Sequence, residues 1–132
     1  MSQVAAIETE FTTGGPRLIL RAEGGALALA AAAAYAASGH GWLLFAALFL
    51  TPDLSFAAYA LGPRVGAFAY NCVHSTVPAL VLAALGQALG DTEVVGVALI
   101  WLAHIGFDRA LGYGLKHGSS FADTHLGRIG KA

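Results

Sequence analysis

Four long apolar stretches make up most of this chain, and they constrain its fold more than any other feature. They cover residues 18–38, 42–61, 65–89 and 94–115. A transmembrane helix needs about 20 mostly apolar residues to cross roughly 30 Å of hydrocarbon, and each stretch has that length. Their Ala- and Leu-rich runs lack the alternation of apolar and polar residues that a transmembrane barrel requires. The sequence therefore predicts an all-α integral membrane protein with four transmembrane helices.

Composition excludes several other classes of protein. Charged residues make up 11% of the chain and hydrophobic residues 57%, whereas a soluble domain carries about 25% charge. The formal net charge of −1 leaves no basic surface for phosphates, so we expect no nucleic-acid partner. A single cysteine, Cys72, excludes an internal disulfide and any cysteine-rich metal site. The expected partner is the lipid bilayer.

The breaks between the stretches are short and rich in turn-forming residues. They read Gly-His-Gly at 39–41, Gly-Pro-Arg at 62–64 and Gly-Asp-Thr-Glu at 90–93. Connections this short predict a four-helix bundle in which successive helices run up and down. We expect a flexible arm at residues 1–16, a membrane domain at 17–116 and a cytoplasmic C-terminal tail at 117–132.

The basic residues predict the orientation of this bundle. All seven fall on one side of the expected membrane: Arg17, Arg21, Arg64, Arg109, Lys116, Arg128 and Lys131. Cytoplasmic loops carry an excess of Lys and Arg. Both termini are therefore expected in the cytoplasm.

Polar residues inside the spans share one depth. Counted at 1.5 Å per residue from the cytoplasmic ends, they lie roughly 9 to 17 Å below that boundary; they are Asp53, Asn71, His74, His104 and Asp108. Spacings of three and four residues put Asn71 with His74, and His104 with Asp108, on common helix faces. Because such residues are costly in a membrane and usually face the bundle interior, we predict one buried polar site. Arg21 and Glu23 would lie near its rim.

Two prolines mark the same region. Thr51, Pro52 and Asp53 resemble a helix N-cap, a first-turn proline and an early acid, which predicts a second half-helix starting inside the second span. Pro78 has no N–H for the carbonyl of His74, so that carbonyl is expected to be free. Discontinuous spans are tolerated where they line a cavity.

Each polar residue also has a simpler explanation. Asp53 could only serve the helix break, Asn71 could bond two helices together, and Asp108 could only neutralise Arg109 or Arg21. The histidines could be satisfied core residues. Four ionisable groups at one depth are better explained by a common site. In the tail, Asp123 and His125 could fold over the cytoplasmic mouth as a lid, or the tail could be solvated.

Several motifs carry a resemblance to a known family. They are Leu-Arg-Ala-Glu-Gly at 20–24, Pro-Asp-Leu-Ser at 52–55, Gly-Pro-Arg-Val-Gly-Ala at 62–67, Tyr-Asn-Cys-Val-His at 70–74, the run at 101–116 and Thr-His-Leu-Gly at 124–127. From Arg17 to Arg128 the chain resembles the small bacterial membrane family catalogued as domain of unknown function 4260. The resemblance implies a multi-pass protein of the cell inner membrane and no particular activity.

The residues themselves favour a metal-dependent membrane enzyme, most plausibly a hydrolase. His74, His104 and Asp108 would bind zinc, manganese or iron, with Asp53 as base or fourth ligand. Arg109 or Arg21 would hold an anionic lipid headgroup or other small ligand. Haem between His74 and His104 is a less favoured variant.

Two other functions stay open. Buried His/Asp chains and broken helices also occur in proton- or ion-coupled carriers, although four spans would then need to form a homo-oligomer. Alternatively the chain is a structural or partner-binding subunit, since the Ala-rich first span offers a smooth face for close packing.

Overall fold

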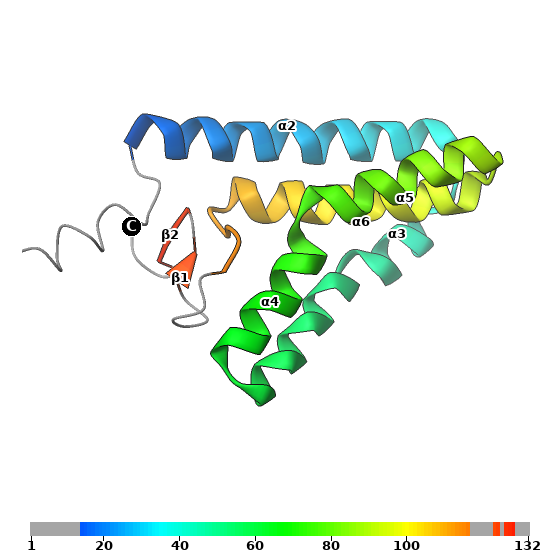
Figure 1. The fold of residues 1–132 in the computed structure, drawn as a ribbon. Helices are drawn as coiled ribbons and strands as arrows, with labels where there is room; N and C mark the ends of the chain where they lie inside the picture. Colours follow the sequence, from blue (N-terminus) through cyan, green and yellow to red (C-terminus); the bar gives the residue numbers. More distant parts are fainter. Residues whose placement is uncertain (1–13, 117–122, 125, 129–132) are drawn as a thin grey trace, which may run out of the picture.

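The computed structural model describes residues 14–116, 123–124 and 126–128. Within them the chain is helical apart from one short hairpin (Figure 1). The elements are α2 (Gly14–Ser38), α3 (Trp42–Phe49), the 3₁₀ helix η1 (Thr51–Leu61), α4 (Pro63–His74), α5 (Thr76–Leu89), α6 (Thr92–Ala110), β1 (Asp123–Thr124) and β2 (Gly127–Arg128). They form four helical regions, which confirms the predicted all-helical fold. The last residues of the expected arm, 14–16, are the first turn of α2.

The predicted breaks are the places where the chain reverses. Gly39, Gly62 and Gly90 adopt φ angles of 79°, 114° and 67°, a conformation that glycine reaches without the clash a Cβ would cause. The Asp91 side chain accepts hydrogen bonds from Glu93 N and Val94 N at 3.1 Å and so caps the start of α6. The chain therefore reverses its direction at each of these glycines (Figure 1).

The central helix is α6, which packs against α2, α5 and α3. Its contact with α2 is built from small residues. A Cβ placed on Gly106 would lie 2.6 Å from both Ala28 N and Gly24 O. The backbones of α2 and α6 can therefore come this close only because residue 106 has no side chain. This confirms that the Ala-rich first helix packs closely, as small residues do in membrane bundles.

The second and third spans are not continuous helices. α3 ends at Phe49 and η1 begins at Thr51, with Pro52 in its first turn, as the sequence predicts. The predicted N-cap is wrong, because Leu50 occupies the cap position and the Thr51 hydroxyl donates to the Leu48 carbonyl instead. Ser75 separates α4 from α5 in an extended conformation (φ −76°, ψ 145°), and its side chain caps α5 by accepting from Val77 N. The predicted span 65–89 thus contains two helices, and the chain breaks between them just before the turn that contains Pro78.

The two breaks redirect part of the chain. η1 and α4 pack on each other, where Gly66 leaves room for the Tyr59 ring. In Figure 1, α3 and η1 slant together away from α6 and α4 runs back beside η1, whereas α5 lies along α6. Only α2, α6 and α5 therefore keep the predicted bundle arrangement.

The fourth helix is shorter than predicted. It ends at Ala110 rather than at Leu115, and Gly112 follows with a φ of 88°. Residues 111–116 leave α6 and cross to α4. The guanidinium of Arg21 donates from Nε to the carbonyl of Ala110 at 2.9 Å, which satisfies one of the carbonyls exposed at this helix end.

The outer surface indicates a membrane protein. Three helical segments are long and apolar enough to cross a bilayer: Gly14–Ser38, Trp42–Leu61 and Pro63–Leu89. Large apolar side chains are exposed on them, among them Leu43 at 84% and Leu29 at 75%. α6 is not one of the three, because it carries Glu93, Asp108 and Arg109 and is largely enclosed by the other helices.

Candidate metal centre

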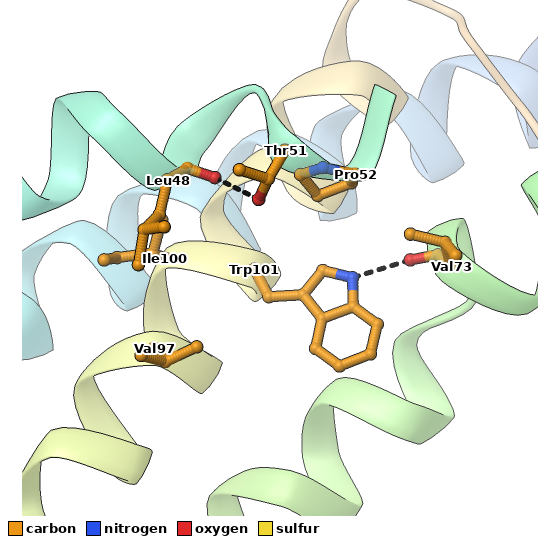
Figure 2. Close-up of a pocket in the computed structure, with 7 residues that line it drawn as sticks. All are labelled: Leu48, Thr51, Pro52, Val73, Val97, Ile100 and Trp101. Carbon is orange, nitrogen blue, oxygen red and sulfur yellow. Dashed lines mark hydrogen bonds between the residues drawn. The ribbon is translucent and has the colours of Figure 1, made fainter. Parts of the chain in front are cut away.

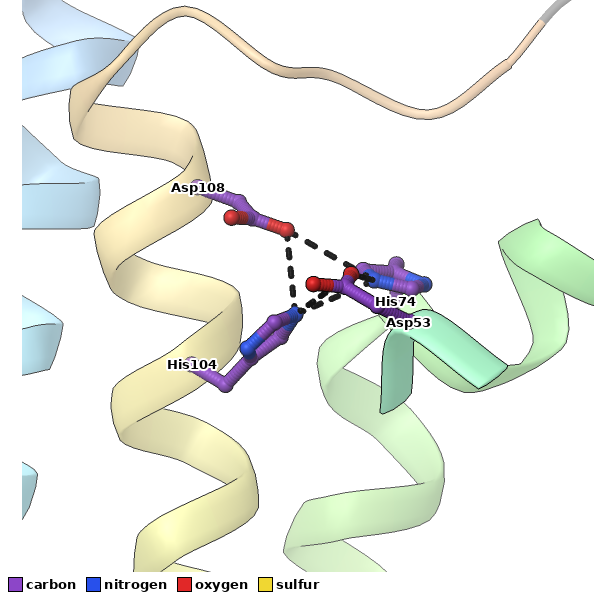
Figure 3. Close-up of side chains that lie close together, drawn as sticks. All are labelled: Asp53, His74, His104 and Asp108. Carbon is purple, nitrogen blue, oxygen red and sulfur yellow. Dashed lines mark hydrogen bonds and ion pairs between the residues drawn. The ribbon is translucent and has the colours of Figure 1, made fainter. Parts of the chain in front are cut away.

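Four ionisable side chains from three elements meet beside α6 (Figure 3). Asp53 lies in the first turn of η1, His74 is the last residue of α4, and His104 and Asp108 are one turn apart on α6. Both helix breaks are needed for this arrangement, since one precedes Asp53 and the other follows His74. The polar layer predicted from depth alone is thus confirmed for these four residues.

The four ligand atoms lie within 4.8 Å of one another. Nε2 of His74 is 3.2 Å from Nε2 of His104, 3.3 Å from Oδ1 of Asp53 and 3.5 Å from Oδ2 of Asp108. Nε2 of His104 is 3.2 Å from Oδ1 of Asp53 and 3.1 Å from Oδ2 of Asp108.

Five of the six separations are close to those of a tetrahedral metal site, and the sixth, between the two carboxylate oxygens, is within 4.8 Å. Ligand atoms about 2.0–2.1 Å from a zinc ion at tetrahedral angles lie about 3.3–3.4 Å from one another. Five of the six pairs here fall between 3.1 and 3.5 Å. Haem does not fit this geometry, because two nitrogens 3.2 Å apart leave no room for a macrocycle between them.

The hydrogen bonds of His74 fix which atom faces the cluster. Its Nδ1 lies 2.9 Å from the carbonyl of Tyr70, and a carbonyl only accepts, so Nδ1 carries the proton. Nε2 therefore presents a lone pair to the cluster when the ring is neutral. A metal-binding histidine typically donates its other N–H in this way. The lone pair of His74 Nε2 and those of the Asp53 and Asp108 carboxylates then converge on one point. One N–H from His104 cannot donate to all of these acceptors at once.

Burial distinguishes the four residues. The side chains of His74 and His104 are 3% and 1% exposed, and that of Asp108 is 14% exposed. Asp53 is 34% exposed. The two histidines are therefore buried, Asp108 is partly exposed, and Asp53 is the most exposed residue of the cluster.

Aromatic rings hold both imidazoles in place. The Tyr70 ring stacks on His74 with centroids 3.7 Å apart and planes within 8°. Phe49 meets His104 edge-on at 5.3 Å. Rings packed in this way resist rotation of the imidazoles about χ2, so the Nε2 atoms of both histidines stay directed into the cluster.

Two side chains of α6 bind the carbonyls that the α4–α5 break leaves without helical partners. Trp101 Nε1 donates to the carbonyl of Val73 at 2.6 Å, and Arg109 Nη2 donates to the carbonyl of His74 at 3.0 Å. The His74 carbonyl, expected to be free opposite Pro78, is thus held by Arg109. Both bonds fix the end of α4, and His74 with it, against α6.

Other predicted site residues lie outside the cluster. Asn71 binds the main chain of Lys116 twice, accepting from its N at 2.6 Å and donating to its O at 2.8 Å. Arg21 binds the end of α6, and Glu23 is exposed. The backbone of Asp123 belongs to β1, which pairs with β2. The side chain of Asp123 and all of His125 lie outside the described residues, so the predicted lid stays a prediction.

Lys116 is a buried residue, although the sequence predicted only that it is one of the basic residues on the cytoplasmic side. It is 5% exposed, and its Nζ lies 4.8 Å from the centre of the Tyr70 ring. Burial lowers the pKa of its ammonium to about 8, although Asp108 and Asp53 favour the charged form. Nothing in the local sequence signals this burial, because the residue follows a glycine-rich turn rather than a helix.

Comparison with known proteins identifies the chain's family. A family model described as "Domain of unknown function (DUF4260)" matches residues 17–129, so the chain belongs to that family, as its motifs predict. No curated protein and no solved structure matches the chain. The chemistry of the site therefore has to be argued from its geometry.

Proposed function

We propose that this protein is a metal-dependent hydrolase of the membrane. His74, His104 and Asp108 hold the ion, and Asp53 is the base or an exchangeable fourth ligand. The observation that carries the proposal is the spacing of the four ligand atoms, 3.1 to 3.5 Å for five of six pairs, which matches tetrahedral coordination.

The donor set favours a particular class of ion. Two imidazole nitrogens and carboxylate oxygens suit zinc, manganese or iron. Among these, zinc is the ion whose sites are most often four-coordinate and tetrahedral. We therefore expect zinc to bind most tightly.

The chain's own residues suit a hydrolytic reaction. A metal held by three protein ligands polarises a carbonyl or phosphoryl oxygen and lowers the pKa of water. Asp53, at the solvent-accessible edge of the cluster, takes the proton of the attacking water and passes it to the leaving group. One ester or amide bond breaks, and one water is divided between the acid and the alcohol or amine that form.

The positive charge of Arg109 indicated that it holds an anionic headgroup, but this proposal gives it a positioning role. Its Nη2 binds the carbonyl of His74, so we assign it to positioning His74 rather than to holding an anionic headgroup. Arg21 binds the end of α6 and is assigned in the same way to positioning that helix.

The direct test is metal analysis of detergent-purified protein. We expect about one zinc per chain, and loss of that zinc in His104→Ala and Asp108→Ala. His40→Ala is the matched control, since the Nε2 of His40 lies 2.9 Å from the Thr92 carbonyl at the opposite end of α6. Asp53→Asn should keep the metal and lose hydrolytic activity. Wild-type protein with no metal, and no stabilisation by added zinc, manganese or iron, would overturn the proposal.

A proton-coupled carrier is the second candidate. The observation in its favour is a His/Asp network that joins two broken helices through contacts of 3.1 to 3.5 Å, since such networks relay protons in transporters. Under this reading no metal binds, and reconstituted vesicles should show proton flux that His104→Ala abolishes.

The proposed location is the inner membrane, with both termini in the cytoplasm and the metal site in the cytoplasmic half of the bundle. The asymmetry of the basic residues supports this orientation. Reporter fusions at Ala132 and at His40 should report opposite compartments. Fusions that report the same compartment would contradict the orientation.

A further inference from the structure

An apolar pocket of about 320 Å³ lies where α3 and the start of η1 face α6 and the end of α4 (Figure 2). That volume is within the range of small-molecule sites, about 300–1,000 Å³. Seven residues line it: Leu48, Thr51, Pro52, Val73, Val97, Ile100 and Trp101.

Three residues of the pocket lie next to the cluster in the sequence. Pro52 and Val73 immediately precede the cluster residues Asp53 and His74, and Trp101 lies one turn before His104. Ile100 and Val97 continue along α6, away from Asp108. On α6 the lining therefore runs for about 6 Å, from Trp101 to Val97, and its far end lies about 10 Å along the helix from His104.

The lining offers nothing to a polar ligand. None of the seven residues is charged, and only Thr51 and Trp101 have hydrogen-bond donors in their side chains. The Thr51 hydroxyl already donates to the Leu48 carbonyl at 2.6 Å, and Trp101 Nε1 donates to Val73. The polar groups of any occupant would have to lie at the cluster end, where two histidines and two carboxylates meet.

We propose that this pocket binds the alkyl chain of a single-chain lipid whose ester or amide group lies at the Asp53–His74–His104–Asp108 cluster. That this lipid is the substrate rests on the proposed function. An apolar slot whose far end lies about 10 Å along α6 from a hydrolytic site selects an amphiphile of medium chain length. The bilayer around α3 and α5 supplies such chains. Because a chain leaving the bilayer is already in hydrocarbon, selection comes from the shape of the slot rather than from removing apolar surface from water.

Trp101 provides a direct probe of occupancy. The chain has two tryptophans, so Trp42→Phe leaves Trp101 as the single one, and bromine quenches tryptophan fluorescence on contact. Titration with 6-bromohexanoate in detergent, whose bromine would lie in the part of the pocket lined by Trp101, should quench Trp101 saturably. Trp101→Phe, which keeps the exposed Trp42, should show only weak quenching that does not saturate.

Filling the pocket should remove this binding. Val97→Phe in the Trp42→Phe background should raise the half-saturating concentration about tenfold or more, because the larger ring occupies the volume that the chain would fill. Val97→Ile should give a smaller shift of the same sign. Val81→Phe is the matched control, because Val81 is 61% exposed on α5 and does not line the pocket. Equal quenching in Val97→Phe and Val81→Phe, or quenching of Trp101 that never saturates, would overturn the inference.

Metal content separates this inference from the proposed function. Val97→Phe should retain the zinc of the wild type, which also shows that it folds. Saturable quenching in protein that binds no metal would support the pocket and contradict the hydrolase. Bound zinc together with an ineffective Val97→Phe would contradict the pocket alone.

Discussion

Two adjacent glycines of α2 provide a sharp test of the way this helix packs against α6. A Cβ on Gly24 would lie 2.3 Å from Arg109 Cβ, 2.9 Å from Gly106 O and 3.0 Å from Ala110 N. A Cβ on Gly25 would meet only Ala110 Cβ, at 3.8 Å, which is ordinary van der Waals contact. We therefore predict that Gly24→Ala destabilises the protein and that Gly25→Ala does not.

The expected difference can be estimated from the two sites. Both substitutions gain the same helix propensity, about 1 kcal/mol, so that gain cancels in the comparison. Gly24→Ala also presses against backbone atoms of α6 that cannot rotate away, and overpacking of this kind costs about 1–3 kcal/mol. The free energies of unfolding of the two variants should differ by that amount, with Gly25→Ala the more stable.

Thermal unfolding in detergent, followed by circular dichroism, measures the difference. A gap of about 3 °C or more in Tm is expected from the stability difference. Gly24→Ala should also lower zinc occupancy, because α6 would have to shift at Arg109. Equal Tm values for the two variants would refute the close α2–α6 contact.

Two further predictions concern the segment that crosses from α6 to α4. Asn71→Leu removes both hydrogen bonds to the Lys116 main chain, a loss of about 1–3 kcal/mol, and hydrogen exchange at residues 111–116 should accelerate about 5- to 100-fold while zinc content stays unchanged. Lys116 has a folded-state pKa of about 8 against an ordinary 10.5, so the unfolded chain binds more protons between these values and stability should rise with pH across that interval. Lys116→Met should abolish the rise in thermal melts, and a rise of equal size in the variant would contradict the burial of this ammonium.

The residues of the cluster were predictable because an ionisable group inside an apolar span is rare and costly. The depth of each such residue in the membrane then follows from the helical rise and from its distance in residues to the end of the span. His104 and Asp108 needed only their spacing of four residues. Asp53 needed the signal of a half-helix starting at Thr51, which the structure confirms at η1.

The sequence does not predict which side chains of the polar layer point into the cluster and which point away from it. Asn71 and His74 share a helix face by spacing, yet Asn71 binds Lys116 while His74 joins the cluster. The reason is that residues 111–116 leave α6 and reach α4 beside Asn71, and no spacing along α4 indicates the path of that segment. The end of α6 at Ala110 was missed because residues 111–115 are apolar enough to continue a span, and only Gly112 indicates the turn.

Removal of Arg109 gives a final prediction, because two interpretations of this residue predict opposite changes in metal affinity. As a cation next to Asp108 in the sequence, it would weaken the binding of a second cation, so its removal should strengthen metal binding if charge alone matters. As the donor that holds the His74 carbonyl at 3.0 Å, it positions a ligand, and loss of such a partner typically lowers metal affinity about 10- to 100-fold. We predict the second result for Arg109→Met, measured by competition with a zinc chelator. Arg64→Met is the control, since Arg64 is exposed at the start of α4. Because both ligand histidines remain in Arg109→Met, weaker zinc binding would come from lost positioning, whereas unchanged or tighter binding would show that Arg109 does not position His74.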